Sequence, residues 1–199
     1  SFVLGLHGPC ASFETACSAS LVALHSAARA LPHTECGEHL AAGVNLMLLE
    51  ANSVGMAIAG MTSVAGRCHT FDSRADGFCR GEGCSVVVIR ISEARAALRL
   101  ILHGSAVRQD GRSASLTAPN GQAQQGLLRG ALSDACLEAR AISLIEAHGT
   151  GTPLGHPPEV GSLGAVHGEH ASALALGAAK ASVGHSEAAS GQVGLARLR

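Results

Sequence analysis

Aromatic residues are scarce in this 199-residue sequence: they make up 2% of it, and neither Trp nor Tyr occurs. Hydrophobic residues still reach 47%, so the core must be built from small aliphatic side chains, which allow helices and strands to approach closely. Charged residues amount to 15% and the net charge is −1, a balance that argues against nucleic acid or a membrane surface as a partner. No apolar run approaches the roughly 18 residues of a membrane span, and no secretory signal is visible. The composition indicates one folded domain.

Paired metal-ligand spacings are also missing. The seven cysteines are an odd number, and without a secretory signal we expect reduced thiols in the cytoplasm, with an organelle as the open alternative. Cys36 with His39, and His167 with His170, have short spacings, but neither pair finds a second pair to complete a four-ligand set. We therefore expect no bound metal.

Strands that alternate with helices are predicted along the whole chain, which indicates an α/β fold. The apolar patterns predict strands at residues 1–6, 11–13, 40–49, 84–91, 100–107, 142–147 and 174–177. They predict helices at residues 17–31, 53–61, 92–96, 123–139, 158–167 and 187–198. Loops are expected at residues 70–83, 148–155 and 180–185.

Cys17 lies where the strand at 11–13 turns into the first long helix, in the segment ETACSAS of residues 14–20. Unpaired backbone N–H groups and the helix dipole at such a position favour a thiolate, so Cys17 is a candidate nucleophile. The alternative is a buried structural thiol, which is the ordinary role of a free cysteine. His25 cannot be its base within the same helix, because eight residues span about 12 Å.

Two later loops carry a histidine each. Residues 148–155 (HGTGTPLG) follow a predicted strand, but their glycine spacing fits neither a dinucleotide loop nor a P-loop. Residues 180–185 (KASVGH) contain Lys180, the single lysine among fourteen Lys and Arg residues. A lysine kept in so arginine-rich a sequence suggests a chemical role, because an ammonium group is not interchangeable with a guanidinium.

Taken together, the segments ETACSAS (14–20), EAHGTGT (146–152) and KASVGH (180–185) resemble the Cys-His-His signature of β-ketoacyl synthases. Supporting matches are GVNL (43–46), the stretch 71–83, QDGR (109–112) and LTAPNG (116–121). Gly151 and the segment TPLG (152–155) are more similar to type I polyketide synthases than to stand-alone fatty-acid enzymes.

The resemblance implies the thiolase-like fold, with layers in the order α-β-α-β-α and two similar halves. The cysteine half would run from residue 1 to about 95, and the histidine half from about 100 to 199. This chain is similar to the central portion of such a domain, without its opening strands and its C-terminal glycine-rich loop. Ser1 in place of Met, and a helical pattern interrupted at Arg199, also suggest an excised piece.

The activity that the resemblance implies is a decarboxylative Claisen condensation by an acyltransferase that elongates a polyketide or fatty-acid chain. Cys17 would take an acyl group from a carrier protein, and a malonyl-type thioester would lose CO₂ and attack it. His148 and His185 would stabilise the developing oxyanion through neutral imidazole N–H groups. The phosphopantetheine belongs to the acyl carrier protein partner, so no cofactor of this domain itself is expected. The complete domain is expected to form a homodimer.

Four further residues match functional positions of the family. The resemblance makes Lys180 and Glu159 a supporting pair that holds His185 and fixes the local charge. It places Thr150 and Thr152 where the family hydrogen-bonds the pantetheine arm.

Two positions depart from the family pattern in a way that bears on function. His156 stands where the family has an aspartate that stabilises the loop, and Pro158 stands where it has an aliphatic residue. These departures keep open a non-elongating domain that binds or gates acyl chains. A Cys-His hydrolase is a weaker alternative, because the sequence around Cys17 has no papain-like or caspase-like pattern.

The chain taken alone is expected to fold poorly. Its first long helix is apolar on most sides, and in the family part of its cover comes from segments outside this sequence. Exposed sheet edges and apolar patches favour aggregation. We therefore expect residues 1–199 by themselves to be inactive.

Overall fold

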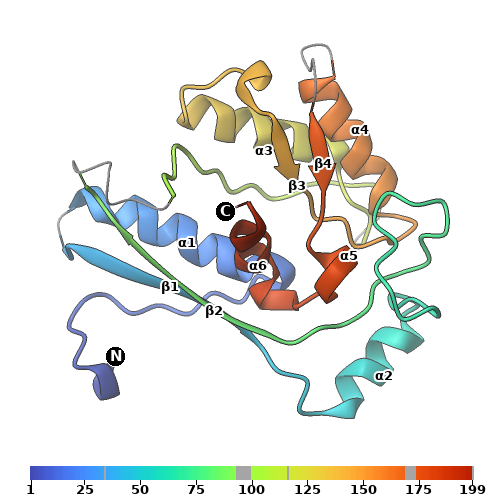
Figure 1. The fold of residues 1–199 in the computed structure, drawn as a ribbon, viewed down its shortest axis with the longest axis horizontal. Helices are drawn as coiled ribbons and strands as arrows, with labels where there is room; N and C mark the ends of the chain where they lie inside the picture. Colours follow the sequence, from blue (N-terminus) through green and yellow to red (C-terminus); the bar gives the residue numbers. More distant parts are fainter. Residues whose placement is uncertain (34, 93–99, 116, 169–173, 199) are drawn as a thin grey trace.

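The computed structural model describes residues 1–33, 35–92, 100–115, 117–168 and 174–198, arranged as two small sheets with helices beside and between them (Figure 1). The strands are β1 (Glu38–Asn45), β2 (Gly83–Arg90), β3 (Leu144–Glu146) and β4 (Ala175–Gly177). The α-helices are α1 (Ala19–Ala30), α2 (Glu50–Ile58), α3 (Gly121–Asp134), α4 (His156–His167), α5 (Lys180–Val183) and α6 (Ser190–Arg197). Short 3₁₀ helices are η1 (Phe2–Leu4), η2 (Ala16–Ser18), η3 (Leu31–His33), η5 (Ala139–Ala141) and η6 (Glu187–Ala189).

β1 and β2 form an antiparallel pair in which Glu38 lies opposite Arg90 and Asn45 lies opposite Gly83. Side chains alternate between the two faces of such a pair. On β1, Ala41 and Gly43 are buried, and the alternating residues Leu40, Ala42 and Val44 are exposed. One face of this pair is therefore covered, and small residues let the covering helices come close.

Helices α1 and α6 lie on that covered face. A Cβ atom added to Gly43 would come within 2.7 Å of Ser20 Cβ, so only glycine permits this approach of α1 to β1. Gln192 of α6 bonds to α1, β1 and β2. Its Nε2 donates to the carbonyl oxygens of Ser20 and Ala41, and its Oε1 accepts from Ser85 Oγ at 2.7 Å. The buried amide is thus fully bonded, as buried polar groups require.

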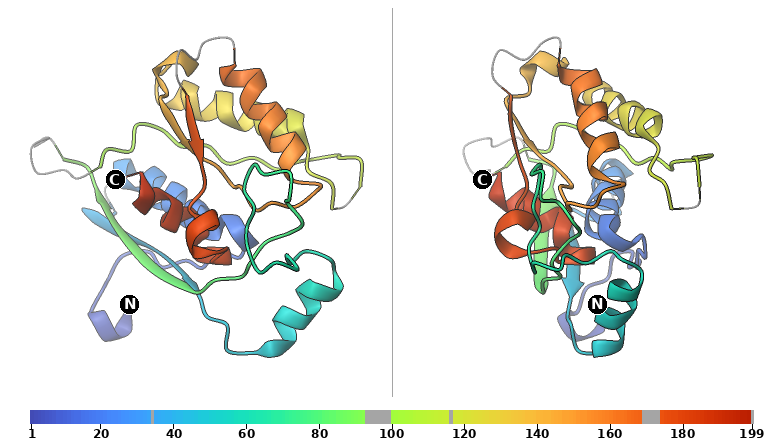
Figure 2. Two further views of the ribbon diagram at one scale, coloured as in Figure 1. Left: turned by 45° about the vertical axis from the view of Figure 1, so that its right-hand side comes forward. Right: turned by 90° about the vertical axis from the view of Figure 1, so that its right-hand side faces the viewer.

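α6 also contacts the second sheet, the parallel pair of β3 and β4. Arg197 of α6 lies 3.4 Å from Glu146 of β3. α3 and α4 pack against each other, with Ser162 Oγ donating to the Gly121 carbonyl at 3.0 Å, and they lie beside β3 and β4, away from β1 and β2 (Figures 1 and 2). The start of α1, beside α6, therefore lies between the sheet of β1 and β2 and the sheet of β3 and β4 (Figure 1).

The segment between α2 and β2, residues 59–82, has no strand, and we call it the linking loop. Its only sheet-like contacts among the described residues are the single bridges from Thr62 to Phe78 and from Arg80 to His185. The loop predicted at 70–83 is therefore confirmed. Figure 2 shows this segment extending from the first sheet toward α5 and the loop before α4.

Most predicted elements are confirmed with shifted ends, and four predictions are wrong. Residues 1–6 contain η1, and residues 11–13 and 100–107, all of them described, form no strand. Residues 180–183, predicted as loop, form the short helix α5. The apolar patterns at the missing strands are real, but a strand also needs a neighbouring strand to pair with. The helix predicted at 92–96 lies almost wholly outside the described residues.

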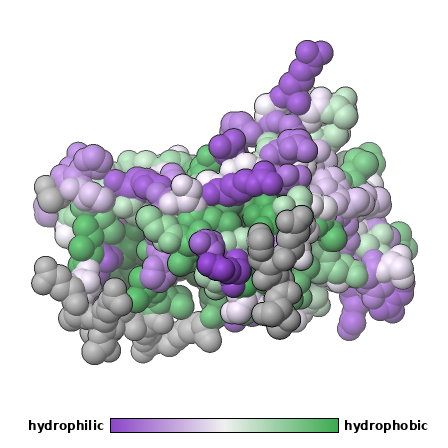
Figure 3. Space-filling model, turned by 90° about the horizontal axis from the view of Figure 1, so that it is seen from above, coloured by the Kyte–Doolittle hydropathy of each residue, from purple (hydrophilic) through white to green (hydrophobic). Residues whose placement is uncertain are grey.

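Apolar side chains remain at the surface of this chain (Figure 3). Leu40 and Val88, which pair across β1 and β2, are 49% and 57% exposed, on the face that α1 and α6 do not cover. These exposed side chains agree with the apolar patches expected from the sequence.

Within the described residues, no helix combines the length and the apolarity that a membrane crossing needs.

Candidate active site

Cys17 is the middle residue of the 3₁₀ turn η2, and this turn comes directly before α1. Ala16 has a φ of 52°, in the left-handed region that costs a residue with a side chain about 1–3 kcal/mol. The turn is fixed by Ser18 Oγ, which donates to the Thr15 carbonyl at 2.9 Å, and by Ser190 Oγ, which donates to the Cys17 carbonyl at 3.2 Å. The predicted position at the start of the helix is confirmed.

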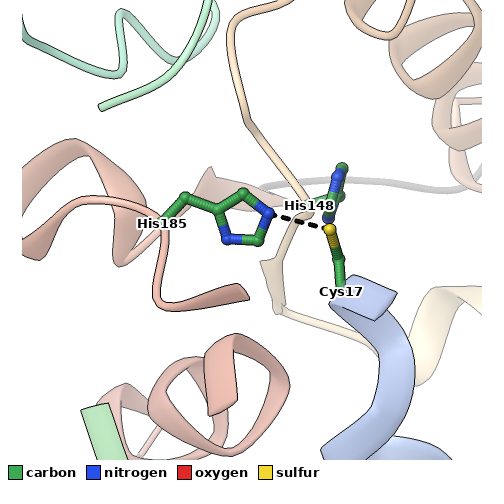
Figure 4. A group of neighbouring side chains, drawn as sticks. All are labelled: Cys17, His148 and His185. Atoms are coloured by element: carbon green, nitrogen blue, oxygen red, sulfur yellow. Dashed lines mark hydrogen bonds between the residues drawn. The ribbon is translucent and has the colours of Figure 1, made fainter. Parts of the chain in front are cut away.

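His185 is held by main-chain contacts to the linking loop. Its N–H donates to the Cys79 carbonyl at 2.7 Å, and its own carbonyl accepts from Gly81 N–H at 2.9 Å. The side chain is 1% exposed, and its Nε2 lies 3.0 Å from Cys17 Sγ (Figure 4). The residue is thus placed by backbone geometry, with its ring directed at the thiol.

The tautomer of His185 follows from its second ring nitrogen. Nδ1 accepts the backbone N–H of Glu187 at 3.2 Å, so the neutral ring carries its proton on Nε2 and can donate toward Cys17. Glu187 is itself fixed by Arg80, whose Nε lies 2.6 Å from the carboxylate, and Arg80 also donates to Ser53 Oγ. The sequence reasoning missed Arg80 and Glu187, although both lie in or beside quoted motifs.

His148 faces the same point from the other sheet. Its ring stands edge-on to the ring of His185, with centroids 5.6 Å apart and planes at 90°. Its backbone N–H and that of Gly149 both donate to the carboxylate of Glu159, at 2.6 and 3.0 Å. Glu159 lies in the first turn of α4, so one helix fixes the backbone on which His148 stands.

Both oxygens of Glu159 bind the backbone at His148 and Gly149. Its charge also favours the charged form of Lys180, and the supporting pair that the resemblance implies stays a prediction. Within the described residues, no hydrogen bond joins Glu159 to His185. The sequence could not show which of the two histidine loops the start of α4 faces.

Lys180 is buried at 7% exposure in the centre of the site. Burial lowers the pKa of Lys180, and the nearby Cys17, Glu159 and Glu146 oppose this shift by favouring its charged form. The carboxylates of Glu159 and Glu146 thus favour a positive charge on Lys180 inside the site.

Both histidines are neutral at physiological pH. Burial, followed by the charge of Lys180 and the influence of the nearby His156, lowers the pKa of His148 to about 4, although the residue has an exposed surface. Burial, followed by the charges of Lys180 and His148, lowers the pKa of His185 to about 3. A neutral imidazole can donate its N–H to an oxyanion while the ring itself carries no charge.

The thiol of Cys17 does not follow the prediction from its position. We expected the helix start to favour its thiolate, but burial raises the pKa of Cys17 above its usual value, and the nearby Lys180 only partly offsets this. Desolvation disfavours the charged form, and here it outweighs the charge of Lys180.

The two threonines of the loop differ in their surroundings. Thr150 is buried at 5% exposure, whereas Thr152 is partly exposed and its Oγ1 accepts from Gly155 N–H at 3.2 Å. Pro158, an unexpected residue at its position, falls in the first turn of α4, where a missing N–H leaves no hydrogen bond unmade.

His156 and Thr70 are functional candidates that the sequence reasoning did not assign. Thr70 Oγ1 of the linking loop donates to the Gly149 carbonyl at 2.6 Å. His156 Nε2 lies 3.1 Å from Gly151 N and 3.4 Å from Phe71 N, so it contacts the loop after His148 and the linking loop together. The unusual His156 is therefore an integral part of the site.

Sequence-distant residues also create a possible ligand set for a metal. Cys17 Sγ and one ring nitrogen each of His148 and His185 all lie within 4.8 Å of one another (Figure 4). Spacing along the sequence could not reveal this group. The positive charge of Lys180 beside it disfavours a cation, and the same three atoms suit a reaction at sulfur.

Comparisons with known proteins agree along nearly the whole chain. Residues 1–94 match the model of the β-ketoacyl synthase N-terminal domain, and residues 100–198 match that of the C-terminal domain. The chain is 47% identical to one subunit of the phenolphthiocerol/phthiocerol polyketide synthase of Mycobacterium tuberculosis, over 98% of this chain and 9% of that protein. It is 45% identical to another subunit of the same synthase, over 98% of this chain and 11% of that protein.

Solved structures agree as well. The oxazolomycin ketosynthase domain from Streptomyces albus matches 99% of this chain with a TM-score of 0.93 and 33% identity. The ketosynthase from module 6 of the bacillaene synthase of Bacillus subtilis matches 99% with a TM-score of 0.90 and 36% identity. These neighbours have the thiolase-like fold, which confirms the predicted fold class. The chain spans 35% and 36% of these two structures, and about a tenth of the two polyketide synthase proteins.

Proposed function

This chain belongs to the β-ketoacyl synthase family, and we propose that it forms the active-site portion of a condensing domain in a polyketide synthase. In this proposal the domain elongates an acyl chain by decarboxylative Claisen condensation. The cysteine half, residues 1 to about 95, carries the acyl chain, and the histidine half, residues about 100 to 199, prepares the extender.

The observation that carries the proposal is the meeting of Cys17, His148 and His185 at one point. The three come from the start of α1, the end of β3 and the segment after α5, and their ligating atoms lie within 4.8 Å of one another. One nucleophile beside two neutral N–H donors suits a reaction in which a thioester is attacked and an oxyanion develops.

The first step is acyl transfer to Cys17. Its sulfur attacks the carbonyl carbon of an acyl thioester, the new S–C bond forms, and the carrier's thiol leaves with the proton that Cys17 gives up. Because burial raises the pKa of Cys17, this proton loss needs the positive charge of Lys180 close by.

The second step joins two carbon atoms. The bond between the malonyl carboxylate and its α-carbon breaks, CO₂ leaves, and the carbanion attacks the acyl carbonyl on Cys17, whose sulfur is released. His148 and His185 donate to the thioester oxygen of the extender while it holds the negative charge. Loss of one such donor typically lowers the rate about 10²–10³-fold.

The remaining residues support these steps. Lys180 adds positive charge near Cys17, and Glu159 fixes the backbone of His148 through two hydrogen bonds. We assign Thr150 and Thr152 to the pantetheine arm, on the resemblance alone.

The partners in this proposal are acyl carrier proteins, which bring both thioesters on their own phosphopantetheine, and a second copy of the domain as a homodimer. The seven cysteines all lie in the described part and are all free, which suits a reducing compartment such as the cytoplasm.

The test uses the complete condensing domain that contains this chain, incubated with an acyl-pantetheine thioester and a malonyl carrier protein. We expect an acyl-enzyme and a β-keto product by mass spectrometry. Cys17→Ala should abolish acyl loading and leave some decarboxylation of the malonyl group. Cys136→Ala, an exposed cysteine at the end of α3, is the matched control and should load normally.

Each alternative gives a different result. Acyl-enzyme without product would indicate a non-elongating domain, and release of free acid would indicate a hydrolase. Acyl loading of Cys17→Ala at the wild-type rate would overturn the assignment of the nucleophile.

A further inference from the structure

We propose that His156 is a positioning residue, which fastens the His148 loop (residues 147–155) to the linking loop through an unprotonated Nε2 and releases it when protonated. This inference rests on the condensation proposed above and extends it to a residue of this particular chain. His156 is the first residue of α4, where the family resemblance leads one to expect an aspartate.

The evidence is the arrangement of donors around one ring nitrogen. Nε2 of His156 lies 3.1 Å from the backbone nitrogen of Gly151 and 3.4 Å from that of Phe71. Both of these atoms carry hydrogen and can only donate, so Nε2 must present its lone pair to them. The imidazole is therefore neutral, with its proton on Nδ1. It acts as an acceptor, as a carboxylate at this position would.

The contact is reinforced by stacking. The rings of His156 and Phe71 have centroids 5.2 Å apart and an angle of 23° between their planes. Phe71 has a φ of 55°, a backbone conformation that a residue with a side chain keeps only where its surroundings fix it. His156 supplies two such constraints on Phe71, one on its N–H and one on its ring.

The two loops also meet beside His156. Gly77 N–H donates to the Gly151 carbonyl at 3.0 Å, and Thr70 Oγ1 donates to the Gly149 carbonyl at 2.6 Å. His156 adds a further contact to this seam between the two loops, three residues before Glu159, which binds the backbone of His148. A shift of the seam is therefore transmitted to the histidine that faces Cys17.

A proton on Nε2 would reverse the contact, because a donor would then face two donors. Asp72 and Arg74 follow Phe71, which His156 contacts, and Glu159 lies on its own helix. His69 lies beside Gly151 and faces Asp76, and the electrostatic effect of His156 reaches His148. The carboxylates of Asp72 and Glu159 are already engaged. Asp72 is paired with Arg74 at 2.7 Å, and Glu159 binds two backbone N–H groups. Within the described residues, no carboxylate is hydrogen-bonded to His156.

The pH range of the effect separates His156 from the other histidines of the site. Histidine is the side chain that ordinarily changes charge between pH 5 and 8. His148 and His185 stay neutral throughout that range, because their pKa values are lowered to about 4 and about 3. A pH profile of condensation that differs between the wild type and His156→Asp therefore reports His156.

The experiment measures single-turnover condensation by the complete domain, with Cys17 already acylated so that its own titration is removed. We compare the wild type with His156→Asp, which keeps an acceptor that is ionised across the range, and His156→Phe, which keeps the stacking only. His25→Asn is the matched control, since His25 bonds Ser105 away from the site. Heteronuclear NMR of histidine-labelled protein reports the tautomer of His156 independently of activity.

We expect the wild-type rate to fall several-fold between pH 7.5 and 5.5, and the His156→Asp rate to stay level over that interval. His156→Phe should condense about tenfold more slowly at every pH, because two N–H groups lose their acceptor, and should still load Cys17 normally. His25→Asn should follow the wild-type profile.

An equal fall with pH in the wild type and His156→Asp would overturn the proposal, as would an Nε2-protonated His156 at pH 7.5. If the wild type gives no β-keto product at any pH, the proposed condensation fails instead. The NMR tautomer still decides whether His156 is the acceptor described here.

Discussion

The two histidines that face Cys17 are held in different ways, although both lie against the linking loop. His185 is fixed by main-chain hydrogen bonds to Cys79 and Gly81 and is 1% exposed. His148 is exposed, and its loop has one main-chain bond to the linking loop, from Gly77 to Gly151. Ala147 N–H also bonds the Gly177 carbonyl of β4, and the side chains of Thr70, His156 and Glu159 supply the further support.

This difference shows where the site tolerates sequence change. A contact between backbone atoms survives most substitutions, because every residue but proline supplies the same donor and acceptor. A contact from a side chain is lost with that side chain. The position of His185 should therefore change only when a substitution crowds the backbone. The position of His148 can be weakened, or made to depend on pH, by changing single side chains.

The largest effect is expected from Gly81→Ala, which disturbs the main-chain hydrogen bonds that hold His185. A Cβ atom at Gly81 would lie 2.7 Å from the carbonyl oxygen of Val183, so the backbone must move and carry His185 away from Cys17. We expect condensation to fall about 10²–10³-fold, as for the loss of an oxyanion donor. The free energy of unfolding should fall by about 1–3 kcal/mol. Product formation and thermal melting of the complete domain are the measurements.

Gly161→Ala is the control for this change, because a Cβ there meets nothing within 4 Å and alanine favours a helix interior. It should leave both measurements near wild type. A fully active Gly81→Ala would mean that backbone contacts do not fix His185. The proposed difference between the supports of His185 and His148 would then be wrong.

A smaller effect is expected from Glu159→Gln on the side-chain side. The amide keeps one acceptor oxygen, but its NH₂ group would face the N–H of His148 or Gly149 without bonding to it. We expect condensation to slow by about 10- to 100-fold, since hydrogen bonds to a charged group are worth about 1.5–3 kcal/mol. Loading of Cys17 should change less, which a parallel acylation assay measures.

Glu138→Gln is the matched substitution, in a surface pair with Arg140 whose side chains are 70% and 72% exposed. Such pairs contribute little, so its rates should equal those of the wild type. Equal losses of loading and condensation in Glu159→Gln would point to a general folding defect and against a specific hold on His148.

Local sequence predicted those parts of the fold that depend on short-range patterns. The start of α1 beside Cys17 and both ends of the β-branched strand β2 were predicted within about two residues. The strands expected at 1–6, 11–13 and 100–107 do not form, because pairing depends on distant segments that an apolar run cannot reveal.

The site divides in the same way. The quoted motifs pointed to Cys17, His148 and His185, and the structure brings these three together. Contacts between different segments of the chain determine three further features. These are the side to which Glu159 points, the acceptor role of His156 and the burial of the Cys17 thiol. Burial in particular arises only when the chain has folded, so a raised cysteine pKa could not be deduced from its place at a helix start.

The smallest effect is expected from Thr70→Val, which removes one neutral hydrogen bond from the His148 side. Valine has nearly the shape of threonine, so the packing of Thr70 against Gly149 is kept and only the 2.6 Å bond to the Gly149 carbonyl is lost. A bond of this kind is worth about 0.5–1.5 kcal/mol, which predicts a loss of about 2- to 10-fold in condensation. Thr70→Ser keeps the hydroxyl and should restore the wild-type rate. Because Glu159 and His156 still support the loop, combining Thr70→Val with His156→Phe should cost more than the two single losses multiplied together. A strictly multiplicative double variant would show that Thr70 and His156 act independently in supporting the His148 loop.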